Sequence, residues 1–411
     1  LALIHAKGNM LYAAGDISGA SRAFEDAVLV SVGRRVHGIH GLIRNILNVV
    51  SSMDVFNPTP RQSALCMPTT GELMPVLLPP EKALRTAALV FSKHCQLPGL
   101  RYTSQGAPRT SAISTTSNSL LSLAKIFQDG MTNSSQSPMA TSRPCGTADI
   151  LALYYLSLSL QPSPSTSNNI GILLASIPQQ ISDRAVQMAD ADSVPTIPGV
   201  KPGSGVALAL AYYNYGLNLD SRHAHLYTNL GSLLKDIGQL AAAIKMYEQA
   251  VACDGHFDIA LANLANAVKD QGRISDAIEY YKRAVASSPN FTEAVCGLAN
   301  ALNSVCDWTG RGGIVFEGAK YDRWHVGEDG MLCDAKTSAV GTGWMKRVVA
   351  IVNKQLEDGA SWGCGTLNSQ VLRLMLQELE IADTGGQWSN DKASAIDRKS
   401  TRLNSSHQYY L

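Results

Sequence analysis

The sequence predicts an all-α fold, a superhelical solenoid of stacked helix pairs with long disordered inserts. Residues 224–257 align without a gap to residues 258–291, so the chain carries an internal repeat of 34 residues. Small residues recur at the same offsets in both copies, where two helices need to approach closely. The stretches outside the repeats are rich in Ser, Thr, Gly and Pro and lack helical periodicity, which is typical of flexible loops. Each helix pair is therefore expected to bury its apolar face only against its neighbours.

The two aligned copies give the repeat its register. Gly238 and Gly272 fall where the first helix of each copy ends, a position that favours positive φ and therefore glycine. Tyr247 and Tyr281 recur at a position that fills the gap to the next repeat. This pattern resembles the tetratricopeptide (TPR) family, whose repeat is a helix-turn-helix unit of about 34 residues. The expected repeat-packing residues of the two copies are Gly231, Ala243, Tyr247, Ala250, Ala265, Ala277, Tyr281 and Ala284.

The chain begins with a further unit of the same type. Within residues 1–35, the packing positions are taken by Gly8, Ala20, Phe24 and Ala27. Residues 36–119 carry no such copy of the pattern. They are expected to hold helices at 36–53 and 81–95, followed by a flexible Ser/Thr-rich loop at 98–118.

Residues 120–223 are expected to be degenerate repeat units interrupted by inserts. Helical patterns fall at 120–127, 148–160, 168–176 and 209–219, and inserts rich in Ser, Thr and Pro fall at 131–146 and 195–202. Regular repeats occupy residues 224–308. The first helix of a third regular repeat begins after Phe291, but the pattern of a second helix does not follow it directly.

Residues 309–396 are expected to be a Gly-rich insert followed by helices at 343–356 and 369–379. In the first of these helices, five apolar residues fall on or near one face: Met345, Val348, Val349, Val352 and Leu356. Residues 397–411 resemble the translation of a sequencing-library adapter and are expected to be an artefact. Because the chain also begins with Leu1 rather than Met, it is expected to be a fragment cut at both ends.

The composition gives no sign of a nucleic-acid or membrane partner. The formal net charge is +1, so the chain lacks the excess positive charge that favours binding to nucleic acid or to anionic membranes. The longest apolar run falls far short of the roughly 20 residues that a membrane helix needs, and no signal peptide opens the sequence. The 8 cysteines show no CxxC pair, which favours reduced thiols in a cytosolic or nuclear protein.

The sequence predicts neither a metal site nor a cofactor site. His37 and His40 bring two imidazoles near one helix face, but two ligands do not complete a zinc site. The glycine-rich run at 199–205 lacks the Gly-Lys-Ser/Thr ending that cradles phosphate, and the glycines at 310–313 follow no strand pattern. These features are expected to be surface histidines and loops.

One stretch carries a more specific resemblance. Residues 204–308, which end in LANALNSVCDW and are followed by MKRVVAIVNKQL, resemble the end of the repeat domain of eukaryotic O-linked N-acetylglucosamine (O-GlcNAc) transferases. In that family a CDW-like element marks the junction with the catalytic half. The resemblance implies a glycosyltransferase of the nucleus and cytoplasm, which moves N-acetylglucosamine from UDP-GlcNAc to Ser or Thr of proteins. The family's catalytic residues lie beyond the junction and nothing here matches them, so the resemblance implies a fragment that is inactive alone.

The same resemblance points to a peptide-binding groove. In the family, asparagines in the first helix of each repeat form a ladder that holds the substrate backbone, and an amide offers both a donor and an acceptor for that task. The ladder is interrupted at Gly297 in this chain. The alternative is that these asparagines are solvated or bond within their helices, and that the aspartates are ordinary exposed carboxylates. The candidate groove residues are Asn169, Asn229 and Asn263, with Asp236 and Asp270 adding side-chain preference.

Two further interpretations stay open. A stand-alone TPR adaptor or scaffold would hold partner peptides in the same groove and catalyse nothing. A chaperone-docking adaptor would cluster Lys and Arg for the C-terminal carboxylate of a peptide. The basic residues fall on different helices and faces, which ranks that class last: Lys235, Lys245, Lys269, Lys282 and Arg283. Protein or peptide substrates are the expected partners, and the sequence leaves open whether the chain forms a homodimer.

Overall fold

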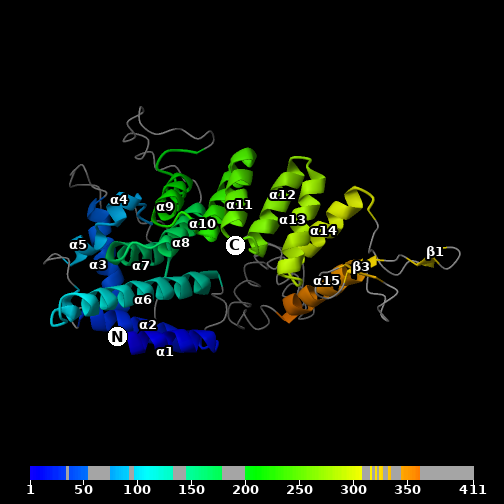
Figure 1. Ribbon diagram of the computed structural model, residues 1–411. Coiled ribbons are helices and arrows are strands. Elements are labelled where there is room, and N and C mark those ends of the chain that lie inside the picture. The colour runs from blue at the N-terminus through cyan, green and yellow to red at the C-terminus, as the bar shows by residue number, and fades with distance from the viewer. Residues whose placement is uncertain are drawn as a thin grey trace, which may run out of the picture. The chain divides into compact units, whose positions relative to one another are not determined.

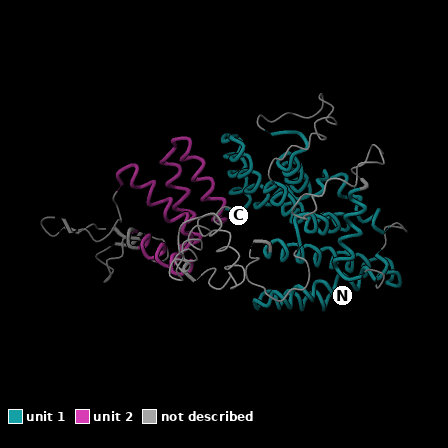
Figure 2. Tube along the Cα trace, turned by 180° about the vertical axis from the view of Figure 1, so that it is seen from behind, with its two compact units in different colours: residues 1–132, 142–255 teal, residues 133–141, 256–411 magenta. Residues whose placement is uncertain are grey.

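The computed structural model describes residues 1–33, 37–53, 75–91, 97–132, 145–177, 200–307 and 344–361, and the short segments 315–316, 320–321, 324–326 and 332–334. The chain falls into two compact units, coloured separately in Figure 2: unit 1 comprises 1–132 and 142–255, and unit 2 comprises 133–141 and 256–411. The predicted all-α fold is confirmed, because every described element outside 315–334 is a helix.

All secondary-structure elements in the described part of unit 1 are helices (Figure 1). Consecutive helices pack as antiparallel pairs where short turns join them, as between α1 and α2 and between α10 and α11. The helices of this unit are α1 (Ala2–Ala13), α2 (Ile17–Val32), α3 (Gly38–Met53), α4 (Pro80–Ala83), α5 (Thr86–Val90), the 3-10 helix η1 (Pro98–Leu100), α6 (Ala107–Thr132), α7 (Thr147–Leu160), α8 (Pro164–Ala175), α9 (Gly205–Leu219), α10 (Ala224–Asp236) and α11 (Leu240–Cys253).

A glycine packed against an aromatic ring recurs in these helix pairs. A Cβ atom added to Gly231 of α10 would lie 2.7 Å from Cε1 of Tyr247 in α11, closer than any side chain tolerates. The same contact joins Gly8 to Phe24 and Gly171 to Tyr213. Glycine therefore lets the ring fill the space between the two helices, and this contact sets their separation.

Helix α6 corrects one expectation from the sequence. The flexible loop predicted at 98–118 is wrong from Ala107 onward, where α6 begins. Three hydroxyls of this helix donate to the carbonyl four residues earlier, at Thr110, Thr115 and Ser119. Such bonds satisfy polar side chains without leaving the helix, so a Ser/Thr-rich segment can pack like an apolar one.

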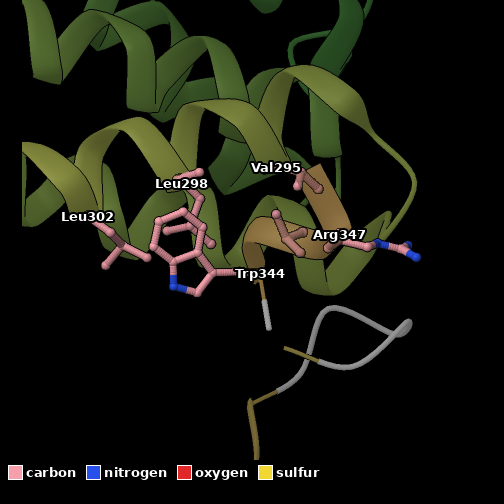
Figure 3. Close-up of a pocket in the computed structure, with 7 residues that line it drawn as sticks. Val295, Leu298, Leu302, Trp344 and Arg347 are labelled. Atoms are coloured by element: carbon pink, nitrogen blue, oxygen red, sulfur yellow. The ribbon is translucent and has the colours of Figure 1, made fainter. Parts of the chain in front are cut away.

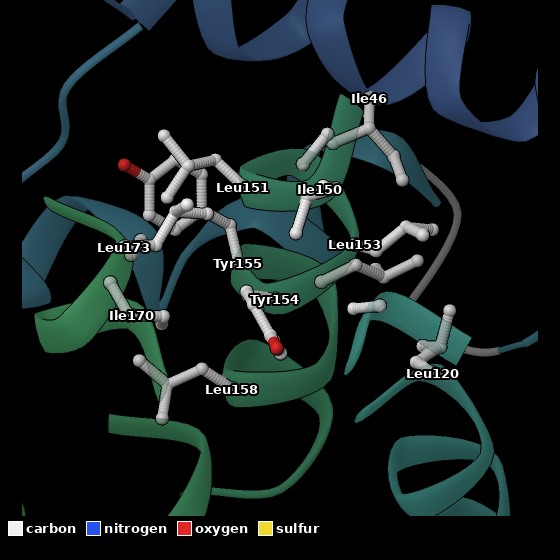
Figure 4. Packing of buried hydrophobic residues seen from close by; sticks show 14 of the residues in the cluster. Ile46, Leu120, Ile150, Leu151, Leu153, Tyr154, Tyr155, Leu158, Ile170 and Leu173 are labelled. Carbon is white, nitrogen blue, oxygen red and sulfur yellow. The ribbon is translucent and has the colours of Figure 1, made fainter. Parts of the chain in front are cut away.

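Helix α7 lies at the centre of unit 1. Its residues from Ile150 to Leu158 are buried on all sides, as expected for a helix that is apolar around its whole circumference. It packs against α3, α5, α6 and α8. Figure 4 shows Tyr154 and Tyr155 leaving α7 in different directions, with Leu173 of α8 and Leu120 of α6 among the surrounding apolar side chains.

The helix predicted at 81–95 is wrong in extent, because the structure divides its first part into α4 and α5. The break has a hydrogen-bond cause. The N–H of Ala87 donates to Oγ of Ser159 in α7, at 3.0 Å, instead of continuing the ladder of one helix. Thr86 Oγ1 donates to the carbonyl of Ala83 and closes the end of α4.

Unit 2 contains α12 (Asp258–Asp270), α13 (Ile274–Ser287), α14 (Thr292–Ser304) and α15 (Trp344–Ser361). The sequence indicates no second helix directly after α14, and the structure supplies one from further along the chain, because α15 packs against α14. The apolar face expected on α15 is largely exposed: Val349 is 52%, Val352 36% and Leu356 66% exposed. Trp344 and Ile351 are buried instead.

Two small antiparallel hairpins lie between α14 and α15 in the sequence, where only a Gly-rich insert is predicted. Strand β1 (Val315–Phe316) pairs with β2 (Lys320–Tyr321), placing Val315 opposite Tyr321. Strand β3 (Trp324–Val326) pairs with β4 (Leu332–Asp334), placing His325 opposite Cys333.

Several predictions fall outside the described residues. They are the inserts within 133–144 and 178–199, the helix at 369–379 and the tail at 397–411. Among the helices that the structure does describe, none combines the length and the hydropathy needed to span a bilayer.

Candidate functional site

In unit 1 an amide–amide hydrogen bond joins the first helices of two successive repeats. Nδ2 of Asn229, on α10, donates to Oδ1 of Asn168, on α8, at 2.8 Å. Asn168 is only 9% exposed, and Asn229 is half-buried. An amide group has two N–H donors and an acceptor oxygen, so this single bond uses only part of what each side chain offers.

Asn169, which the sequence placed in the ladder, serves a different contact. Its side chain lies near Tyr154 of α7 and acts on the pKa of that hydroxyl, which donates to Oε1 of Gln128 at 2.9 Å. Burial raises the pKa of Tyr154, and the polar side chain of Asn169 acts in the opposite direction. The link from α8 to α10 is therefore made by the neighbouring Asn168, which the sequence analysis did not single out.

In unit 2 a chain of polar contacts connects three helices. The hydroxyl of Tyr281, on α13, donates to Oδ1 of Asn266 on α12. Nδ2 of Asn266 in turn donates to Oε1 of Glu293 on α14, at 2.7 Å. Burial raises the pKa of Tyr281, and the charges of Glu293 and Asp270 raise it further. The hydroxyl is therefore a neutral donor at physiological pH.

Asn263, the predicted ladder residue of α12, is half-buried and precedes Asn266 by three positions. Residues three apart on a helix are neighbours on its surface. Asn266, rather than Asn263, makes the hydrogen bonds to Tyr281 and Glu293. The three-residue spacing from Asn263 is the feature of the sequence that points to Asn266, because it places a second amide on the same side of α12.

The ladder interruption at Gly297 has a packing cause. A Cβ atom at this position would lie 2.4 Å from Cε1 of Tyr281. Tyr281 is fully buried, so its ring cannot move into solvent to make room. The ring of the preceding repeat thus occupies the space that an asparagine side chain would need.

Asp236 and Asp270 are exposed and end their helices, α10 and α12. Desolvation raises the pKa of Asp236, and the neighbouring charge of Lys235 lowers it. Nζ of Lys269 lies 6.0 Å from the ring centroid of Tyr281. Each carboxylate therefore follows a lysine at the same end of a repeat.

The predicted repeat-packing residues all lie in the interior. Gly8, Phe24, Gly231, Tyr247 and Tyr281 are buried. The alanines at the remaining packing positions are each fully buried: Ala20, Ala27, Ala243, Ala250, Ala265, Ala277 and Ala284.

The hollows of the described surface include one in each unit. The first, in unit 2, has a volume of about 10 Å³, which is room for roughly one water molecule. Figure 3 shows it between α14 and α15, with Trp344 beside Leu298 and Leu302. The second, of about 480 Å³, lies in unit 1 and mixes apolar and charged side chains of both signs. Its lining residues are Ile4, Lys7, Leu11, Asp16, Gly19, Arg22, Ala23 and Asp26.

Basic side chains in unit 2 have local partners. Nζ of Lys282 lies 3.1 Å from Oε1 of Glu279, and the guanidinium of Arg283 lies 5.8 Å from the ring centroid of Tyr280. His37 and His40, predicted as surface histidines, are exposed. Within the described part of the chain, no group of three or more His, Cys, Asp or Glu side chains is placed to hold a metal ion.

Comparison with known proteins agrees with the repeat register. The family described as tetratricopeptide repeat matches residues 228–291 and 262–303, whereas no curated protein matches the chain. The similar solved structures include MamA, at 16% identity over 51% of this chain and 91% of that chain, with a TM-score of 0.33.

Two more structures are similar at this level. They are Pseudomonas aeruginosa PilF, at 15% identity over 48% of this chain and 72% of that chain, with a TM-score of 0.35, and the first TPR of Spaghetti bound to an HSP90 peptide, at 23% identity over 25% of this chain and 80% of that chain, with a TM-score of 0.24. The family match and the helix pairs together show that this chain carries tetratricopeptide repeats and has the all-α solenoid fold of that repeat.

Proposed function

We propose that this chain is a scaffold that binds partner proteins through extended peptide segments, which contact the first helices of its repeats. The observation that carries the proposal is the amide pair of Asn168 and Asn229, which bridges α8 and α10. Amide groups on successive first helices offer a peptide backbone both donors and acceptors without selecting a side chain.

The first helices α10 and α12 also carry side chains that are open to a partner. Ile259 is 46% exposed and lies four positions before Asn263, so an apolar and an amide side chain are surface neighbours. Asp236 and Asp270 end their helices, where the helix dipole disfavours negative charge. Both carboxylates are exposed, so a partner can reach them.

The experiment is a random-peptide phage display against the purified chain, followed by affinity measurements on the enriched peptides. We expect the double variant Asn229→Ala, Asn263→Ala to lose at least tenfold in affinity. Asn48→Ala is the matched control, because this exposed asparagine lies on α3, outside the proposed surface. Failure to enrich any peptide, or equal affinity in the double variant and the control, would contradict the proposal.

A second candidate is the substrate-selecting part of an O-GlcNAc transferase. The run that ends at Ser304-Val305-Cys306-Asp307 and is followed in sequence by α15 favours it. In this candidate the scaffold selects nuclear and cytoplasmic proteins, and UDP-GlcNAc binds to a catalytic half outside this chain. Sequencing the transcript past the codon for Ile396 separates the two candidates. A reading frame that continues into two nucleotide-sugar-transferase lobes supports the enzyme, and a genuine stop leaves the scaffold.

A further inference from the structure

A short segment without helix or strand, residues 75–79, lies against the second helices of two repeats in unit 1. We call this segment the strap. Its sequence is Pro-Val-Leu-Leu-Pro, followed by Pro80 at the start of α4. Pro79 has φ −69° and ψ 159°, which is the polyproline II conformation, and a residue before proline is likewise held in an extended form. Leu78 is fully buried.

Two tyrosines hold the backbone of the strap. The Tyr155 hydroxyl, from α7, donates to the carbonyl of Val76 at 3.2 Å and accepts from the N–H of Leu78 at 3.2 Å. The Tyr212 hydroxyl, from α9, donates to the carbonyl of Leu78 at 2.9 Å. The two rings are stacked, with centroids 6.5 Å apart and planes at 20°. Their hydroxyls thus bond both polar backbone groups of Leu78.

The tyrosines are suited to this contact chemically. Tyr155 is 1% exposed and Tyr212 is 0% exposed beneath the strap. Burial raises the pKa of Tyr212 well above its usual value, and the nearby Tyr155 and Glu81 raise it further. The Tyr212 hydroxyl therefore stays protonated at physiological pH and keeps the hydrogen that the carbonyl of Leu78 accepts.

We infer that Tyr155 and Tyr212 form a second peptide-binding site, whose ligand is an extended apolar peptide containing a Leu-Pro-Pro sequence, and that the strap occupies this site within the same chain. Polyproline II segments are recognised in aromatic-lined grooves because their backbone is preformed and its polar groups are unpaired. The strap is held in the same way, since the two hydroxyls bond the carbonyls of Val76 and Leu78 and the N–H of Leu78.

This site differs from the surface under the proposed function. Tyr155 and Tyr212 belong to α7 and α9, the second helices of their repeats, whereas Asn168 and Asn229 belong to first helices. A partner segment with the same Leu-Pro-Pro chemistry would displace the strap. The strap is tethered, so its effective concentration reaches about the millimolar range, and a free peptide competes with it only at about millimolar concentration or when the strap is weakened.

The experiment uses the full chain and a fluorescein-labelled synthetic peptide with the sequence of residues 75–91. Binding is measured by fluorescence anisotropy to wild type and to Leu78→Ala, which weakens the strap. We expect the variant to bind the peptide at least tenfold more tightly than wild type. Adding Tyr155→Phe and Tyr212→Phe to Leu78→Ala should remove that gain. The matched control adds Tyr227→Phe, a half-buried tyrosine of α10, and should preserve it.

A second measurement applies whether or not Leu78→Ala folds. In the wild-type chain, hydrogen exchange at the N–H of Leu78 is expected to speed up at least fivefold in Tyr155→Phe, and also when millimolar unlabelled peptide displaces the strap. Unchanged exchange under both conditions would overturn the inference. So would peptide binding that survives loss of both hydroxyls in a folded Leu78→Ala chain. If the double variant Asn229→Ala, Asn263→Ala keeps its affinity for displayed peptides while the strap experiments give the expected results, only the proposed function is contradicted.

Discussion

Ser117 on α6 and Ser157 on α7 exchange hydrogen bonds in the interior of unit 1. Each hydroxyl donates to the backbone carbonyl of the other residue at 2.9 Å, and the two oxygens lie 3.0 Å apart. Ser117 is 3% exposed and Ser157 0% exposed. Small polar side chains therefore bring these two helices together where other pairs use alanine or glycine.

The serine pair predicts a coupled effect on stability. Each single Ser→Ala change is expected to lower the free energy of unfolding by about 1 kcal/mol, because one buried hydrogen bond is lost and alanine leaves little void. A double-mutant cycle in urea should give a coupling energy of about 0.5–1 kcal/mol between Ser117 and Ser157. Strict additivity of the two changes would show that they do not act as a pair.

The glycine–aromatic contact predicts a position-specific cost. Gly231→Ala is expected to lower stability by about 1–3 kcal/mol, because the new Cβ would lie 2.7 Å from the ring of Tyr247. Gly130→Ala is the matched control, since this helical glycine has no atom within 4 Å of an added Cβ. It should gain up to about 1 kcal/mol from helix propensity. Thermal melts that shift equally for both variants would contradict the contact.

His223 predicts a dependence of stability on pH. Its Nδ1 accepts from the N–H of Leu226 at 3.3 Å and so caps α10, which a protonated ring nitrogen cannot do. Burial lowers the pKa of His223 below 6.5, the charge of His225 lowers it further, and Asp220 acts in the opposite direction. In the unfolded chain His223 keeps its ordinary pKa of 6.5 and is protonated at a higher pH than in the folded chain. The stabilisation from the His223 cap is therefore complete above pH 6.5 and is lost as the pH falls.

The measurement is the urea midpoint at pH 7.5 and at pH 5.5 for wild type and His223→Asn. Asparagine caps a helix without titrating, so the variant should lose less stability on acidification. Burial also lowers the pKa of His5, which adds acid sensitivity of the same sign to both proteins. The difference between the two slopes therefore reports His223, and identical slopes would exclude the cap as its origin.

The contacts of α15 predict that this helix can detach from α14 without unfolding the rest of unit 2. Trp344 is 3% exposed, and Nη2 of Arg347 donates to the carbonyl of Pro289 at 2.9 Å and to Oδ1 of Asn290 at 2.8 Å. Trp344→Ala is expected to cost about 3–5 kcal/mol of docking free energy, since a large buried side chain is removed. Hydrogen exchange across α14 should rise in Trp344→Ala and not in Val349→Ala, whose side chain is 52% exposed. Equal exchange in the two variants would refute a docking role for Trp344.

The sequence alone predicts the packing residues correctly where two repeats can be aligned with each other. Ala243 and Ala277 share a register, and so do Tyr247 and Tyr281, because one helix pair is stacked on the next by the same contacts. The composition misled at α6, since Ser and Thr were taken as a sign of a loop. Their hydroxyls bond to carbonyls one turn back, as Thr115 does to Ser111 at 2.8 Å, and this local bonding leaves no signature in composition.

The candidate site shows a second limit of sequence. The repeat register places Asn169 and Asn229 at equivalent positions, yet the residue that accepts the hydrogen bond of Asn229 is Asn168. Asn169 instead lies near the buried hydroxyl of Tyr154 on α7. Which of two adjacent asparagines faces the next repeat depends on tertiary partners, and periodicity alone does not contain them.

The contact between Gly171 and Tyr213 has a consequence for how this chain tolerates change. Gly171 and Tyr213 stand 42 positions apart, whereas Gly8 and Phe24 stand 16 apart, and both pairs make the same contact. Closing a longer connection adds only about 0.6 kcal/mol for each doubling of its length. The connection between α8 and α9 is therefore expected to accept foreign sequence at small energetic cost, so that its sequence can diversify while the contact between the two helices is kept.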